Sequence, residues 1–271
     1  MAIACSTSVA HNCPLDKALE TVHDLGFRYV DVLTVDGWVH VNTQDLADDY
    51  SSTRSRVDAL LQQYQLTPLT TNSGVSPKTH QRSPEINQRR RDETLALVKW
   101  CNSYNIDFAT IQPPLYVDSE LPWDKVLEDC VASLREQKQI GDENGVRFAL
   151  ELHVNSPFET IEQARRLCDA MPELALAYDP TQFVVQGIDF RETEWMMDRA
   201  IHVHIRDAAP GRGQEHFGQG VIDFDWMFSA LQDRGYKGHF SIEYFEFEEG
   251  DGDVLEDVKR ARDAIAQYFP E

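Results

Sequence analysis

Hydrophobic and polar positions along the chain follow one repeated pattern. An amphipathic helical stretch ends near a glycine, and a short β-branched or aromatic run and then polar residues follow it. Clear examples are the stretches 15–26, 126–145 and 228–235, which lead into the segments RYVDVLTV, VRFALELH and GHFSIEYF. In each, the glycine can supply the left-handed backbone that ends a helix and turns the chain into a strand.

Continued along the chain, this pattern predicts eight strands that alternate with helices. The strands are expected near residues 2–7, 28–35, 67–72, 107–112, 147–153, 174–180, 201–207 and 239–245. The helices are expected at residues 14–25, 54–64, 86–104, 123–143, 159–171, 191–199, 224–234 and 253–268. Such alternation indicates βαβ units and a parallel sheet.

Eight such units, without a linker rich in Pro, Gly or Ser between them, predict an α/β fold in one domain, residues 1–271. We expect this domain to be a single (β/α)8 TIM barrel. A doubly wound open sheet is the alternative, but no G-x-G-x-x-G motif follows the first strand. The less regular stretches 36–49, 73–85 and 208–220 follow strands two, three and seven, and in a barrel they lie on the face where active sites are built.

The charge balance narrows the range of partners. The chain has 271 residues with 25 Lys+Arg against 46 Asp+Glu, a formal net charge of −21. Nucleic-acid surfaces need clustered cations, so no nucleic-acid partner is expected. No apolar run approaches the roughly 18 residues that span a bilayer, and the start MAIACSTSVA lacks the features of a signal peptide. We therefore expect a cytoplasmic protein with no membrane partner; a homo-oligomer is possible.

Ionisable residues stand at the ends of the last four predicted strands. They are Glu151 in FALELH, Asp179 in LAYDPTQF, His204 in IHVHIRDA and Glu243 in FSIEYF. In a barrel these side chains converge, and three neighbouring carboxylates raise one another's pKa unless a cation neutralises them. Three carboxylates and one imidazole, without a thiolate, favour one divalent ion such as Mn²⁺, Mg²⁺ or Co²⁺, with Zn²⁺ also possible.

The same segments resemble a known superfamily. FALELH, AYDPTQF, HVHIRDA followed by FGQGVIDF, and GYKGHFSIEY resemble the xylose isomerase-like TIM barrels, the sugar phosphate isomerase/epimerase family. The resemblance is detailed from about residue 147 to 247 and only architectural before that. It implies that Glu151, Asp179, His204 and Glu243 are metal ligands, and that Glu151 and Glu243 are catalytic and move protons at the carbon next to a carbonyl.

Three amide side chains mark departures from branches of this superfamily. In the ketose 3-epimerases that this superfamily resemblance brings in, a His stands three residues after the aspartate. This chain has Gln182 at that position. In the endonuclease IV branch of the superfamily that the motifs resemble, metal-binding His residues stand at the ends of strands three and four. This chain has Asn72 and Gln112 at those positions. Because an amide forms hydrogen bonds but does not titrate, we expect these three residues to bind substrate.

Four further residues are candidate substrate contacts. His153 stands just beyond Glu151, with a plain loop residue as the alternative. Arg206 follows His204 and is either an oxyanion ligand or an ion-pair partner of a neighbouring carboxylate. Arg212, in PGRGQEHFGQG, is a second anion-binding candidate, and Trp38 either stacks on a sugar or packs at the surface.

Together, the residues and the resemblance predict a metal-dependent isomerase or epimerase of a small sugar or keto-sugar, acting by proton transfer through an enediolate. One alternative is a metal-dependent lyase or dehydratase on the same barrel, acting on an inosose, a dehydroshikimate-like acid or a 3-keto-glycoside. A second is a non-catalytic sugar-binding or subunit protein. The excess of negative charge favours a neutral carbohydrate over a sugar phosphate.

Overall fold

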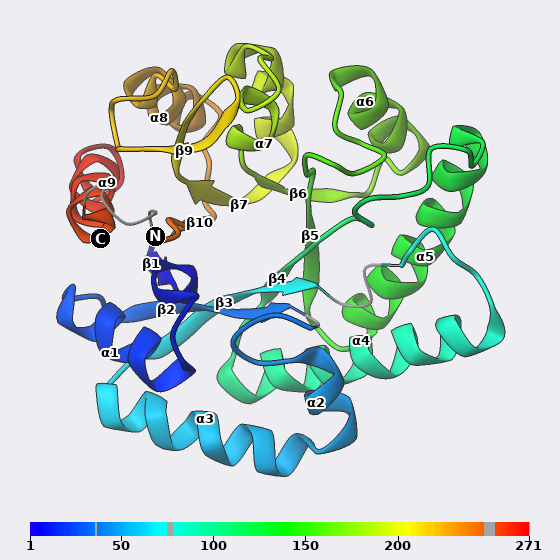
Figure 1. Ribbon diagram of the computed structural model, residues 1–271, viewed down its shortest axis with the longest axis horizontal. Coiled ribbons are helices and arrows are strands. Elements are labelled where there is room, and N and C mark those ends of the chain that lie inside the picture. Colours follow the sequence, from blue (N-terminus) through cyan, green and yellow to red (C-terminus); the bar gives the residue numbers. More distant parts are fainter. Residues whose placement is uncertain (36, 75–77, 247–252, 271) are drawn as a thin grey trace.

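Eight parallel strands close into a barrel with helices around its outside (Figure 1). The structure is a computed structural model that describes residues 1–35, 37–74, 78–246 and 253–270. The barrel strands are β1 (Ile3–Ser6), β2 (Tyr29–Val35), β3 (Thr67–Gly74), β4 (Phe108–Ile111), β5 (Arg147–Glu151), β6 (Ala175–Tyr178), β7 (Ala200–Ile205) and β10 (His239–Ile242). They follow one another around the ring in chain order, and β10 pairs with β1 to close it. The predicted (β/α)8 barrel is confirmed.

The outer helices follow the strands in the expected places. They are α1 (Leu15–Asp24), α3 (Tyr50–Tyr64), α4 (Pro84–Tyr104), α5 (Trp123–Glu143), α6 (Ile161–Ala170), α8 (Phe224–Asp233) and α9 (Val254–Tyr268). Gly26, Gly145 and Gly235 have φ of 78°, 77° and 65°, so the glycines that were expected to end helices adopt the left-handed backbone. Among the described residues, no helix is both long and apolar enough to cross a membrane.

The two faces of each barrel strand have different surroundings. On β7, Val203 and Ile205 belong to the hydrophobic core between the strands and the helices. His202 and His204 alternate with them, are equally buried, and lie on the other face of the strand, inside the barrel. Because successive side chains of a strand point to opposite faces, the polar side chains on β7 point toward the barrel axis and the apolar ones toward the helices.

Several connections differ from the expectation. The predicted helix at 191–199 is a 3-10 helix, η2 (Phe190–Arg199). Its buried Phe190, Thr193 and Met196 recur every three residues, the period of a 3-10 helix. Short elements not predicted from the sequence are η1 (Thr7–Ala10), α2 (Thr43–Asp48), α7 (Thr181–Val184), and the antiparallel strands β8 (Asp207–Ala209) and β9 (Arg212–Glu215). Residues 36 and 75–77 of the expected loops lie outside the described residues.

Candidate metal centre

Four ionisable side chains meet at the carboxyl ends of four consecutive barrel strands. Glu151 ends β5, Asp179 directly follows β6, His204 lies near the end of β7, and Glu243 directly follows β10. All four are buried, and one potential ligand atom from each lies within 4.8 Å of the others. The convergence expected from the sequence is therefore present, and no part of it depends on a loop far from the barrel.

His204 lies between the two glutamates. Its Nδ1 is 3.4 Å from Oε1 of Glu151 and 3.6 Å from Oε2 of Glu243. The backbone register supports this arrangement, because the N–H of Glu243 donates to the carbonyl of Ile205, the residue after His204. Two carboxylates from different strands thus face the same imidazole.

The close packing of these groups shifts their pKa values. Burial raises the pKa of Glu243 to about 7, against the lowering effect of His204. Burial acts in the same direction on Glu151, but attraction to His204 outweighs it and lowers the pKa to about 2. Burial lowers the pKa of His204, yet Glu243 and Glu151 outweigh it and raise the pKa to about 10. In the metal-free chain a proton therefore stays on this cluster at neutral pH.

Two amide side chains hold the carboxylates. Asn72, on β3, donates from Nδ2 to Oε1 of Glu243 at 2.7 Å. Gln182, on α7, donates from Nε2 to Oε1 of Glu151 at 3.1 Å and to Oδ2 of Asp179 at 3.2 Å. Both amides had been expected to bind substrate. In this geometry each also fixes the orientation of a candidate ligand.

Asp179 has a further set of donors at the start of α7. Its Oδ1 accepts hydrogen bonds from the backbone N–H and the hydroxyl of Thr181, at 2.9 and 2.6 Å. Nη2 of Arg206 lies 3.5 Å from Oδ2 of Asp179, so the ion pair considered for this arginine is present. Nε of Arg206 is buried without a hydrogen-bond partner among the described residues, which leaves one donor for a ligand.

A cavity of about 300 Å³ opens at this cluster. Glu151 and Glu243 line it, together with six of the seven expected substrate contacts: Trp38, Asn72, Gln112, His153, Gln182 and Arg206. Its volume is within the lower range of small-molecule sites. The expected catalytic and substrate-binding residues, with one exception, therefore share one space.

The exception is Arg212. It lies on β9, its side chain is 63% exposed, and Nε forms an ion pair of 3.0 Å with Glu215. It is not among the residues that line the cavity. The loop after strand seven folds back as a hairpin, which carries this arginine to the surface.

Two aromatic residues from different loops form one wall. Trp38 stacks on Phe245, with ring centroids 5.9 Å apart and an interplanar angle of 22°. The guanidinium of Arg206 lies 5.1 Å from the centroid of the same Phe245 ring. Phe245 was not among the predicted site residues, because the spacing of the sequence does not show that the last loop meets the loop after β2.

A polar layer lies below the cluster, and its carboxylate, Asp31, was not predicted. Asp31, in the middle of β2, is buried, and a ligand atom of its carboxylate lies within 4.8 Å of those of His202 and His204. Nε2 of His202 pairs with the hydroxyl of Ser241 at 2.9 Å. Burial raises the pKa of Asp31. Its only sequence signal is a charged residue inside an otherwise apolar strand, YVDVLTV.

The donor set fits a divalent cation. Both ring nitrogens of His204 are buried and lack a hydrogen-bond partner among the described residues. Such orphaned atoms are rare in a folded protein unless a ligand satisfies them. Three buried carboxylates beside them supply the negative charge that a cation neutralises, and the oxygen-rich set suits hard or borderline ions.

Fold and site together define a (β/α)8 barrel with a candidate metal centre at the carboxyl ends of its strands. The model of one family, the xylose isomerase-like TIM barrel, matches residues 19–267. The chain belongs to this family, as its motifs had indicated.

Individual relatives have low sequence identity to this chain. An inosose isomerase of Halalkalibacterium halodurans is 23% identical over 268 residues, which cover 94% of this chain and 92% of the relative. An inosose dehydratase of Clostridium perfringens is 26% identical over 149 residues, which cover 47% of this chain and 49% of the relative. Among solved structures, that of the IOLI protein with a zinc atom matches with a TM-score of 0.72 and 21% identity, covering 100% of both chains. This structural likeness shows the shared fold.

Proposed function

We propose that the protein is a divalent-metal-dependent isomerase or epimerase of a small neutral sugar or keto-sugar. One observation carries the proposal: three buried carboxylates and an imidazole whose nitrogens form no hydrogen bond within the described residues converge at a cavity of sugar size. Relatives named inosose isomerase, which span nearly the whole chain, support the same class of reaction.

Glu151, Asp179, His204 and Glu243 would hold the metal. When bound, a divalent cation supplies a Lewis acid that polarises a carbonyl or hydroxyl oxygen and acidifies the neighbouring C–H bond. Mn²⁺, Mg²⁺ or Co²⁺ suit the carboxylate-rich set, and Zn²⁺ is an alternative. The zinc atom named for the structure of the IOLI protein keeps that alternative open.

Glu151 and Glu243 would move the substrate proton. One of the two carboxylates takes a proton from the carbon next to the carbonyl, and the other, in its protonated form, returns one at the adjacent carbon or on the opposite face. Asn72 and Gln182 donate to Oε1 of Glu243 and Glu151, so each carboxylate is held in one orientation. A positioned carboxylate loses less entropy on reaching the transition state than a mobile one.

The remaining lining would orient an uncharged substrate. Gln112 and His153 offer hydrogen-bonding groups, and Trp38 offers an aromatic face on the opposite loop. Arg206 is the one Lys or Arg among the described residues that line the cavity. It already forms an ion pair with Asp179, so it does not provide a free counter-charge for a phosphate group. A neutral sugar therefore matches this cavity better than a sugar phosphate.

A dehydratase on the same scaffold is the second candidate. The match to an inosose dehydratase is 26% identical over about half of this chain and half of the relative. Proton abstraction by the same carboxylate leads to loss of a β-hydroxyl as water instead of reprotonation at carbon. The two reactions share the first step and differ only in the group that leaves.

A single incubation separates the candidates. Purified protein is first analysed for bound metal, then incubated in D₂O with a panel of ketohexoses and inososes, with chelator-treated protein and Glu243→Gln as controls. An isomer that has gained deuterium supports the isomerase, and a product lacking the elements of water supports the dehydratase. Absence of both with every metal tested would contradict metal-dependent proton transfer on these substrates.

A further inference from the structure

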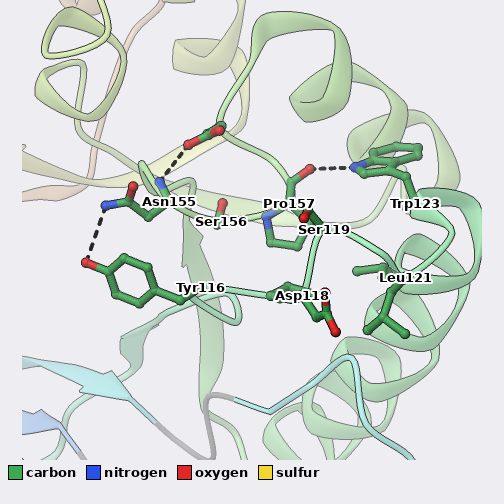
Figure 2. Close-up of a pocket in the computed structure, with 11 residues that line it drawn as sticks. Tyr116, Asp118, Ser119, Leu121, Trp123, Asn155, Ser156 and Pro157 are labelled. Atoms are coloured by element: carbon green, nitrogen blue, oxygen red, sulfur yellow. Dashed lines mark hydrogen bonds between the residues drawn. The ribbon is translucent and has the colours of Figure 1, made fainter.

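A second cavity has a volume of about 420 Å³, and Figure 2 shows the side chains that line it. It is formed by the loop between β4 and α5, the first turn of α5, and the loop between β5 and α6. Among its lining residues are Tyr116, Asp118, Trp123, Asn155, Ser156 and Glu159. None of the residues assigned above to the metal or to substrate binding lines this cavity.

The two cavities are neighbours along both loops. Leu115 lines the metal cavity and Tyr116, the next residue, lines the outer one. On the other loop, His153 lines the metal cavity and Asn155 lines the outer one. Consecutive Cα atoms are about 3.8 Å apart, so on both loops the residues that line the two cavities are close neighbours.

The boundary between the cavities is built from two residues with unusual backbones. Tyr116 and Asn155 have φ of 52° and 62°, in the left-handed region. The N–H of Tyr116 donates to the carbonyl of Asn155 at 2.8 Å, and Nδ2 of Asn155 donates to the Tyr116 hydroxyl at 3.4 Å. Figure 2 shows the two side chains facing each other across the loops. For a tyrosine this conformation costs free energy, whereas an asparagine adopts it readily.

The chemistry of the lining is that of a sugar site. The Tyr116 side chain is 80% exposed, so its ring face is free to contact a ligand. Asp118 and Glu159 each have one carboxylate oxygen bound to a backbone N–H, of Glu120 and Asn155, and their other oxygens have no hydrogen-bond partner among the described residues. The described residues that line it include no Lys, Arg or His. This combination favours a ring with hydroxyl donors and one apolar face, and disfavours anions.

We propose that this cavity is an outer subsite that binds an uncharged pyranose ring. The substrate is then a glycoside or disaccharide, with its reacting keto-sugar at the metal centre and its second ring on Tyr116. The statement that the substrate is a glycoside rests on the proposed function. The statement that a pyranose ring binds beside Tyr116 does not.

Binding of the ring is tested without turnover. Saturation-transfer NMR is recorded on the chelator-treated protein with methyl α- and β-D-glucopyranoside. We expect saturation of the glucoside ring protons by the wild type. Tyr116→Asn should weaken binding roughly tenfold, the effect of losing one aromatic contact. Asn tolerates φ near 52°, so this variant removes the ring and keeps the backbone.

Two further variants make the result specific. Tyr116→Phe keeps the ring and should retain most of the binding. Leu95→Asn, an exposed apolar position on α4 that lines neither of these two cavities, should leave binding unchanged. The subsite proposal is overturned if the wild type transfers no saturation to the glucoside, or if Leu95→Asn weakens glucoside binding as much as Tyr116→Asn does. A change of oligomeric state in Tyr116→Asn also overturns it, because the ring would then be a contact between copies.

Failure of the subsite and failure of the proposed function give different results. Deuterium exchange from solvent is compared for D-fructose and for its glucoside isomaltulose with metal-loaded protein. The proposal predicts that Tyr116→Asn raises KM for isomaltulose roughly tenfold and leaves that for fructose unchanged. If substitution of Tyr116 does not change the exchange, the subsite proposal is contradicted and the proposed function stands. If the glucoside binds but no keto-sugar exchanges deuterium, the proposed function is contradicted and the subsite proposal stands.

Discussion

The side chain of Asn72 donates a hydrogen bond of 2.7 Å to Oε1 of Glu243, and both residues are buried. The two lie on strands separated in the barrel by β1 and β2. An N–H donor favours the charged form of a carboxylate, so this bond opposes the burial that raises the pKa of Glu243. The amide of Asn72 thus acts on the candidate base.

Replacing Asn72 by Leu should lower kcat about 10- to 100-fold, the range found when a partner that orients a metal-site ligand is removed. The carboxylate of Glu243 then loses its donor, its pKa rises, and the acid limb of the pH profile moves to higher pH. Steady-state kinetics between about pH 5 and 9 measure both effects. Asn102→Leu, whose amide donates to the carbonyl of Asn144 on the surface, is the matched control. An unchanged profile in Asn72→Leu would contradict the role.

The metal-free protein should lose stability as the pH rises from about 6.5 to 8.5. His204 has a folded pKa near 10 against an ordinary 6.5. Its stabilisation is complete below the ordinary value and is lost as the pH rises toward the folded value. A cation that replaces this proton should therefore raise the melting temperature more at pH 8.5 than at pH 6.5. Thermal unfolding with and without Mn²⁺ measures the difference, and an equal shift at both pH values, or the same slope in His204→Gln, would argue against it.

Two arginines that the sequence offers as equivalent anion ligands should behave differently. Arg206→Gln removes the ion pair with Asp179 and a group of the cavity wall, and we expect kcat/KM to fall about 10- to 100-fold. Arg212→Gln breaks only an exposed ion pair with Glu215, a contact that contributes at most about 1 kcal/mol, and should leave kinetics unchanged. Equal effects of the two substitutions would mean that the hairpin reaches the substrate.

The stability of the barrel should depend on a glycine, Gly141, on α5. A Cβ at Gly141 would collide with the carbonyl of Val146 and with the Phe148 ring. Gly141→Ala should lower the free energy of unfolding by about 1–3 kcal/mol, despite the better helix propensity of alanine. Gly213→Ala is the control, because its Cβ would meet no atom closer than 3.8 Å, and its effect should stay within about 0.5 kcal/mol. Urea denaturation compares the two variants.

The barrel and the position of its four ionisable residues were predictable because both depend on local pattern. Alternating strands and helices fix the parallel closed sheet, and parallel strands bring Glu151, Asp179, His204 and Glu243 to one end of it. The hydrogen bond from Asn72 to Glu243 was not predicted, because two strands separate the two residues in the barrel. The roles of the four ionisable residues as ligands and bases remain predictions that the experiments above address.

Contacts between distant loops were not predictable. The stacking of Trp38 on Phe245 joins residues from opposite ends of the chain, and Arg212 is carried away from the cavity by a hairpin that spacing does not reveal. The 3-10 geometry of η2 depends on packing that selects a period of three. Asp31 was missed because a charge inside a buried strand has no partner in its own segment.

The hairpin after β7 is joined to the last loop by a reciprocal pair of hydrogen bonds. The amide of Gln214 donates to the carbonyl of Phe245 and accepts from its N–H, at 2.7 and 2.8 Å. An insertion or deletion in the hairpin would shift Phe245, and with it one wall of the cavity, without replacing any of the four clustered ionisable residues. Evolution on this scaffold therefore has a route to new substrates that preserves its chemistry.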